Sequence, residues 1–258
     1  MPRAAIPGGE LQIRGAALST DGRSRVMLGD TQAPIVVGSA GLVIARVPEN
    51  AGGNLVVYNG EESTPAWTCD IGVQIADGVH PVGNPAVDVL GNVYTTLSGQ
   101  RGQKTPVSVY KIDSGGRMKA FVSEIMNATG VAFDRDGMLY ISSRNDGIVY
   151  QCSPKGDMSV YVEGMGIATG IAFDKDDNLY VGDRGGTIFK ISRSRQIYVF
   201  ATIESSIAAY HLAFGPTGDL FVTGPTTSSF DHVQRITPDG HVDVFYRGLG
   251  RPQGMGFD

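Results

Sequence analysis

The sequence predicts an all-β protein, and three observations carry that prediction. Gly and Pro account for 36 and 13 of the 258 residues, about 19% of the chain against roughly 12% in average proteins, which supplies many turns. Short runs rich in β-branched and aromatic residues alternate with Gly, Asp and Asn turns. A sequence unit also recurs about every 40 residues, which is the repeat length of a propeller blade.

The first 70 residues predict a small β-sandwich. Apolar and polar residues alternate in short runs at roughly 10-residue spacing, at 6–15, 25–29, 33–37, 42–48 and 53–59. Such spacing, with no helical pattern between the runs, is typical of a sandwich. After these runs the sequence pattern changes, and we place a domain boundary near residues 69–72.

Residues 73–258 contain the repeat. The stretch 129–140 returns as 169–180, more loosely as 211–221, and upstream as 84–94. The aromatic residue that ends each unit lies at Tyr94, Tyr140, Tyr180 or Phe221, so the spacings are 46, 40 and 41 residues. One unit holds four predicted strands, at 131–133, 138–142, 148–151 and 158–162. Four antiparallel strands per repeat make one propeller blade.

Both ends of the repeat array predict an additional strand. Residues 254–258 match the first strand of a further unit, and residues 73–78 align with the outermost strand at 159–164. We therefore expect a β-propeller of the six-bladed type, with four blades and two extra strands present and the fifth blade truncated. On the repeat length, the native protein would continue for roughly 60–80 residues, and 73–78 would close the ring.

Charge and composition exclude several classes of function. The 21 basic and 26 acidic residues are interspersed and give a net charge of −5, so a nucleic-acid partner is not expected. No apolar run approaches the roughly 20 residues of a membrane span, and no signal peptide begins the chain, which favours a cytoplasmic protein without membrane attachment. Two cysteines are too few for a disulfide framework or a four-ligand zinc site.

The first segment resembles the immunoglobulin-like IPT/TIG fold. The matching stretches are 7–15, 26–30, 43–48 and 55–58. The resemblance implies an Ig-like accessory domain that serves as a spacer or a protein-interaction module.

The second segment is similar to the six-bladed NHL-repeat and gluconolactonase (senescence-marker-protein-like) propellers, on residues 170–183 and their copies. Lactonases of that superfamily hold a divalent metal in the central channel with Glu, Asn and Asp side chains. The matching column here contains Gly83, Thr129, Thr169, Tyr210 and Gln253. None of these is acidic, so the metal set does not carry over and no metal site is predicted.

The next column holds two departures from a Gly pattern, Asn84 and His211, which we expect near the mouth of the channel. His211 is either a neutral lining residue with one hydrogen bond or a general base or ligand for a bound group. Its polar neighbours would be Asn84, Thr129, Thr169, Tyr210 and Gln253. No second His or carboxylate shares this ring.

Arg144 and Arg184 lie four residues after Tyr140 and Tyr180, at matching places in adjacent units. As a pair they would grip an anionic ligand through their planar guanidinium groups. The competing interpretation is that both are solvated or paired with acids in the turns.

Two functions follow. The first is a binding scaffold, with a small-molecule or protein ligand at the propeller face and no required cofactor. The alternative is a metal-dependent hydrolase of sugar lactones, with Ca²⁺, Mg²⁺ or Zn²⁺ in the channel and His211 as the candidate catalytic residue. The sequence leaves open which of these is correct, and therefore whether the protein is an enzyme.

Overall fold

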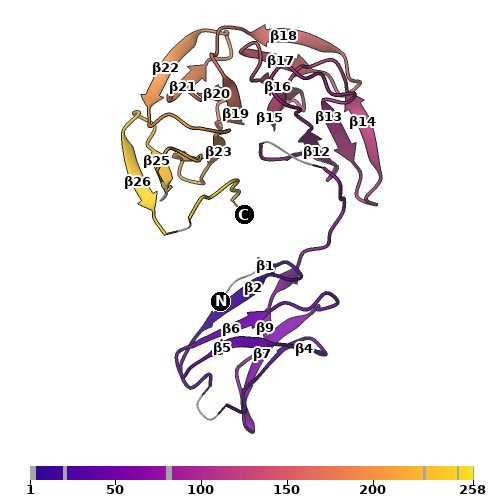
Figure 1. The fold of residues 1–258 in the computed structure, drawn as a ribbon, viewed down its shortest axis with the longest axis vertical. Helices are drawn as coiled ribbons and strands as arrows, with labels where there is room; N and C mark the ends of the chain where they lie inside the picture. The colour runs from indigo at the N-terminus through magenta and orange to yellow at the C-terminus, as the bar shows by residue number, and fades with distance from the viewer. Residues whose placement is uncertain (1–3, 20–21, 80–82, 229–230, 249, 258) are drawn as a thin grey trace. The chain divides into compact units, whose positions relative to one another are not determined.

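The computed structural model describes residues 4–19, 22–79, 83–228, 231–248 and 250–257. The chain divides into two compact units, Met1–Gln74 and Ile75–Asp258. Every regular element in the described residues is a β-strand (Figure 1), so the predicted all-β class is confirmed. Among these residues, no helix is long and apolar enough to cross a membrane.

The first unit is a β-sandwich. One sheet has the order β2-β6-β5, formed by Glu10–Arg14, Leu42–Arg46 and Ile35–Gly38. The other has the order β4-β3-β7-β8, with β9 also paired to β7, formed by Thr31–Ala33, Arg25–Leu28, Asn54–Asn59, Glu62–Ser63 and Trp67–Thr68. Alternate residues of β2 and β3 are buried in one apolar cluster that joins the sheets, including Leu11, Ile13, Val26 and Leu28. The alternation of the sequence thus defines the core face of each strand.

A short parallel ribbon completes this unit. It pairs β1 (Ala4–Ala5) with β10 (Asp70–Ile71).

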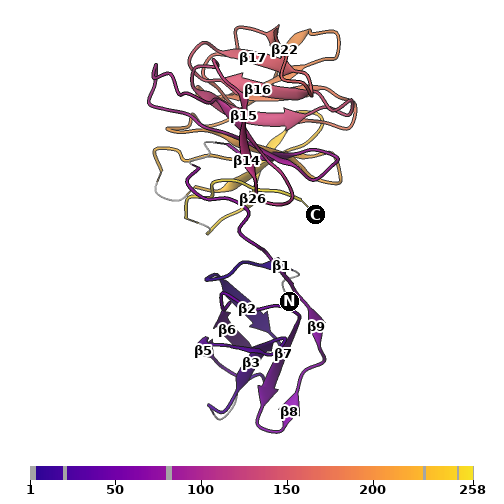
Figure 2. The same cartoon turned by 90° about the vertical axis from the view of Figure 1, so that its right-hand side faces the viewer.

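The second unit is a β-propeller of four-stranded antiparallel sheets, and Figure 2 shows these sheets from the side. Strand order within each sheet follows the chain. Blade 1 contains β11 (Ala86–Val87), β12 (Val93–Thr96), β13 (Val109–Ile112) and β14 (Met118–Val122). Blade 2 contains β15 (Ala128–Phe133), β16 (Leu139–Ser143), β17 (Ile148–Cys152) and β18 (Met158–Val162). Blade 3 contains β19 (Ala168–Phe173), β20 (Leu179–Asp183), β21 (Thr187–Ile191) and β22 (Ile197–Thr202). Blade 4 contains β23 (His211–Phe214), β24 (Leu220–Thr223), β25 (Val233–Ile236) and β26 (Val242–Tyr246).

The repeated aromatic residue joins neighbouring blades. In blades 1 to 3 the aromatic on the second strand packs against one on the fourth strand and against one on the first strand of the next blade, and in blade 4 the last of these partners is Phe257, in the segment that follows the blade. The ring centroids are 4.7–5.0 Å apart, in the sets Tyr94–Phe121–Phe133, Tyr140–Tyr161–Phe173, Tyr180–Phe200–Phe214 and Phe221–Phe245–Phe257. Most of these contacts are edge-on, the arrangement that the charge distribution of aromatic rings favours.

The two predicted end strands are not strands in the described residues, although both segments lie at the expected places. Phe257 packs on Phe221 as the first-strand aromatic of a following blade would. A side chain at Gly116 would come within 2.9 Å of the Ile75 carbonyl, just as one at Gly240 would come within 2.7 Å of the Phe200 carbonyl. Residue 75 thus holds the place of a fourth strand, but no described strand pairs with it, and a strand is defined by that pairing.

The antiparallel order sorts the connections onto two faces of the propeller. The first strand of every blade starts on one face, which we call the entry face. The connections from second to third strand, and from fourth strand to the next blade, also lie there. The turns from first to second and from third to fourth strand lie on the opposite face.

Candidate functional site

The two threonines of the predicted channel ring form hydrogen bonds with the backbone. Both side chains are fully buried. The Thr129 hydroxyl donates to the Asn127 carbonyl at 2.9 Å. The Thr169 hydroxyl donates to the Gly182 carbonyl at 2.8 Å and accepts from the Tyr210 amide at 3.2 Å, which ties blade 3 to the start of blade 4. These hydroxyls are therefore engaged within the protein.

His211 and Asn84 contact each other across the propeller. His211 Nδ1 lies 3.2 Å from Asn84 Oδ1, and the Asn84 amide also donates to the Met255 carbonyl at 3.2 Å. His211 is only 8% exposed. Burial lowers the pKa of its imidazole, since desolvation disfavours the charged form. The Asn84 side chain thus contacts the imidazole at Nδ1 and holds it in place.

The remaining ring residues differ in exposure. Tyr210 is buried, and its hydroxyl donates to the Glu204 carbonyl. Burial raises the pKa of this phenol, so it stays protonated. Gln253 is exposed, in the segment that follows blade 4. Only Gln253 of the predicted ring residues thus presents its side chain freely to solvent.

Arg144 and Arg184 lie at equivalent positions on the entry face. Each follows the second strand of its blade, and its backbone amide donates at 3.2 Å to the connection that enters the blade, at Asn127 or Ile167. Arg144 Nη2 donates to the Gly99 carbonyl at 2.7 Å, and Arg184 Nη2 donates to the Ile207 carbonyl at 2.8 Å. Backbone carbonyls therefore orient both guanidinium groups.

A third arginine, Arg101, belongs to this group, although the spacing of the repeat does not reveal it. It lies in the long connection between the second and third strands of blade 1, which is the counterpart of the connections that carry Arg144 and Arg184. The buried Asn127 side chain holds this loop, since it accepts from the Gly102 amide at 2.8 Å and donates to the Gln100 carbonyl at 2.9 Å. Because this connection is longer in blade 1 than in blades 2 and 3, the spacing of the repeat does not show that Arg101 corresponds to Arg144 and Arg184.

The three arginines create an uncompensated positive charge. Burial, and then the charges of Arg184 and Arg101, lower the pKa of Arg144. None of the three forms a salt bridge with a carboxylate in the part of the chain that the structure describes. Arg144 Nε is also buried without a hydrogen-bond partner. A group of positive charges without an ion-pair partner among the described residues suits an anion.

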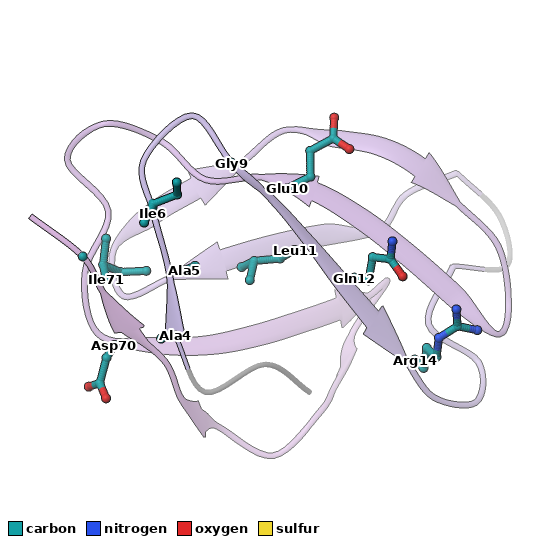
Figure 3. Close-up of a pocket in the computed structure, with 11 residues that line it drawn as sticks. Ala4, Ala5, Ile6, Gly9, Glu10, Leu11, Gln12, Arg14, Asp70 and Ile71 are labelled. Carbon is teal, nitrogen blue, oxygen red and sulfur yellow. The ribbon is translucent and has the colours of Figure 1, made fainter. Parts of the chain in front are cut away.

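Other features of the described residues offer less. They contain no group of three or more His, Cys, Asp or Glu side chains that could hold a metal ion. The first unit has an open pocket of about 960 Å³ between β2 and the β1–β10 ribbon (Figure 3), whose charged lining residues are Glu10, Arg14 and Asp70. All three side chains are exposed, and Glu10 pairs with Arg46 at 3.6 Å.

Comparison with known proteins identifies the fold and no family. No protein-family model matches the chain, and no curated protein matches it. Solved structures do resemble it. An auxiliary nutrient binding protein from Bacteroides ovatus is 12% identical with a TM-score of 0.53, over 98% of this chain and 71% of that one. A second auxiliary nutrient binding protein, from Bacteroides thetaiotaomicron, is 12% identical with a TM-score of 0.51, over 100% and 91%.

A catalytically inactive virginiamycin B lyase from Staphylococcus aureus with quinupristin is 14% identical with a TM-score of 0.52, over 96% of this chain and 77% of that one. At these identities the likeness shows the fold alone.

Proposed function

We propose that this protein is a ligand-binding propeller, with the first unit as an Ig-like accessory domain of the IPT/TIG type and the second related to the NHL and gluconolactonase propellers. Its ligand is a small molecule that carries an anionic group. Arg144 and Arg184 bind that group on the entry face, with Arg101 at the rim. The three arginines whose charges act on one another, with no salt bridge to a carboxylate in the described residues, are the observation that carries the proposal.

The physical argument is a balance of desolvation and charge. A buried donor without a partner costs about 1–3 kcal/mol, and the neighbouring positive charges add repulsion, which shows in the lowered pKa of Arg144. A carboxylate, phosphate or sulfate would relieve the repulsion between these positive charges. Guanidinium groups bind such planar or tetrahedral oxyanions through two parallel hydrogen bonds.

The similar structures support a binding role, since two of them are named nutrient binding proteins. The alternative, hydrolysis of sugar lactones around a divalent cation, would use His211 and acidic side chains. No arrangement of the described residues favours it: His211 is buried and bonded to Asn84.

The proposal is tested by isothermal titration with inorganic phosphate and with citrate. We expect Arg144→Ala and Arg184→Ala each to weaken binding about 10- to 150-fold, which corresponds to the roughly 1.5–3 kcal/mol of a charge-assisted hydrogen bond. Arg117→Ala is the matched control, because Arg117 is exposed in a turn on the opposite face and pairs with Asp113. Equal affinities for the three variants and the parent would overturn the site.

The lactonase alternative is tested by titration with Ca²⁺, Mg²⁺ and Zn²⁺. A cation bound near His211 and Asn84, together with lactone turnover that His211→Ala abolishes, would replace the binding proposal. Absence of cation binding at millimolar concentration would remove the alternative.

A further inference from the structure

A second cavity lies on the opposite face of the propeller, at the junction of blades 1 and 2. Its volume is about 490 Å³, within the range of small-molecule sites. The aromatic set Tyr94, Phe121 and Phe133 lines it, and the turn residues Val89 and Leu90 form its lip. Val89 is 100% exposed and Leu90 79%, an unusual placement for large apolar side chains.

The equivalent junction of blades 2 and 3 is covered by charged side chains. Arg135 Nε lies 2.5 Å from Asp177 Oδ2, and Arg193 Nη1 lies 3.7 Å from the same oxygen. Arg193 Nη2 also lies 3.9 Å from Asp136 Oδ2. These four residues tie the turns of the two blades together. The Asp177 side chain, at 9% exposed, fills the junction.

The repeat places four different residues at the same positions between blades 1 and 2. Val89, Leu90, Gly137 and Pro154 stand where Arg135, Asp136, Asp177 and Arg193 stand one blade later. All four line the cavity. No ion pair can form among them, so the junction stays open and its lip is apolar.

The backbone at the open junction is the same as at the covered one. Gly137 has a φ of 78° and its counterpart Asp177 a φ of 58°. A Cβ at Gly137 would meet no heavy atom within 4 Å. The absence of a side chain at Gly137 therefore leaves this part of the cavity open.

The polar groups of the cavity are already paired, which defines the ligand. Lys111 Nζ lies 3.7 Å from Asp88 Oδ2 and 5.1 Å from the centre of the Tyr94 ring. Asp134 accepts from the Tyr140 hydroxyl at 3.1 Å, and Arg135 pairs with Asp177. The unsatisfied surface is aromatic and aliphatic. We propose that this cavity is a second binding site, for an uncharged small molecule with an aromatic or alicyclic ring, independent of the arginine site.

The test uses the uncharged fluorescent probe N-phenyl-1-naphthylamine with the full chain. We expect saturable binding of one probe molecule. A plugged variant, Val89→Arg with Gly137→Asp and Pro154→Arg, introduces three of the four charged residues of the blade 2–3 junction and should weaken probe binding at least 10-fold. Thermal unfolding by circular dichroism verifies that the variant is folded.

A reciprocal variant serves as the matched control. Asp177→Gly with Arg193→Ala opens the second junction and should raise the stoichiometry to two probe molecules. Arg144→Ala should leave probe binding unchanged, which separates this site from the anion site. Probe binding that is unaltered by the plugged variant, or that never saturates, would overturn the proposal. So would a dimer in light scattering that Leu90→Asp dissociates, since a second copy would then be the occupant.

Discussion

Close approach of the innermost strands makes Gly170 a sensitive probe of how the blades pack. Gly170 lies in β19 of blade 3, and a Cβ at this position would be 2.3 Å from the Tyr210 carbonyl oxygen and 2.9 Å from its carbonyl carbon. Both atoms are backbone, so no side-chain rotation relieves the overlap. The substitution Gly170→Ala therefore requires the first strands of blades 3 and 4 to separate by about 1 Å to reach ordinary van der Waals contact.

The expected change in the free energy of unfolding for Gly170→Ala is the sum of two opposing effects. Overpacking of a close-packed interior costs about 1–3 kcal/mol, while Gly→Ala stabilises by about 0.4–1 kcal/mol through the unfolded chain. The net loss is about 1–2 kcal/mol, since the two effects partly cancel. In a unit of this size each kcal/mol lowers the Tm by about 2–4 °C, so we expect a decrease of about 2–8 °C.

Differential scanning calorimetry measures this decrease, with Gly256→Ala as the control. A Cβ at Gly256 would meet no heavy atom within 4 Å, and this glycine lies in the same unit. The Tm of the control should change by less than about 2 °C, because unconstrained surface substitutions stay within about 0.5 kcal/mol. If Gly170→Ala melts at the same temperature as Gly256→Ala, the inner strands are not in close contact and the reasoning is refuted.

Three further predictions concern the core, pH and thiol chemistry. Leu139→Ala removes a side chain that is 1% exposed and should lower the free energy of unfolding, measured with urea, by about 2–5 kcal/mol. Val89→Ala, at a fully exposed position, should change it by no more than about 0.5 kcal/mol. Equal losses for the two variants would contradict the assigned core. Burial lowers the pKa of His211, so the unfolded chain binds more protons and the free energy of unfolding should fall as the pH drops below about 6.5. His211→Gln should reduce this dependence of stability on pH. An unchanged dependence in the variant would contradict the role assigned to His211. Cys152 is fully buried with its pKa raised to about 11, so it should react with Ellman's reagent at pH 8 only after unfolding. Rapid reaction of this thiol in the native protein would contradict its burial.

The sequence predicted the strands of blade 2 to within a few residues of β15, β16, β17 and β18. It succeeded because each strand is a local pattern bounded by turn residues, and because the repeat presents that pattern several times. The recurring aromatic was visible as a spacing, while its two partners on neighbouring strands were not.

The candidate site depended on contacts between residues far apart in the chain. The hydroxyls of Thr129 and Thr169, which the sequence places in the channel ring, donate to neighbouring backbone carbonyls. Arg101 joins the arginine group only because Asn127, 26 residues later, holds its loop.

The β-strands, the repeat and the fold class can be predicted from the amino-acid sequence, because hydrophobic alternation and turn chemistry act over a few residues. Which polar groups remain unpaired depends on contacts that form only in the folded chain. At the junction of blades 1 and 2 the tertiary structure also showed that Gly137 and Pro154 leave a cavity. Hydrogen-bond satisfaction and packing are settled between blades, where each residue meets partners about 40 positions away.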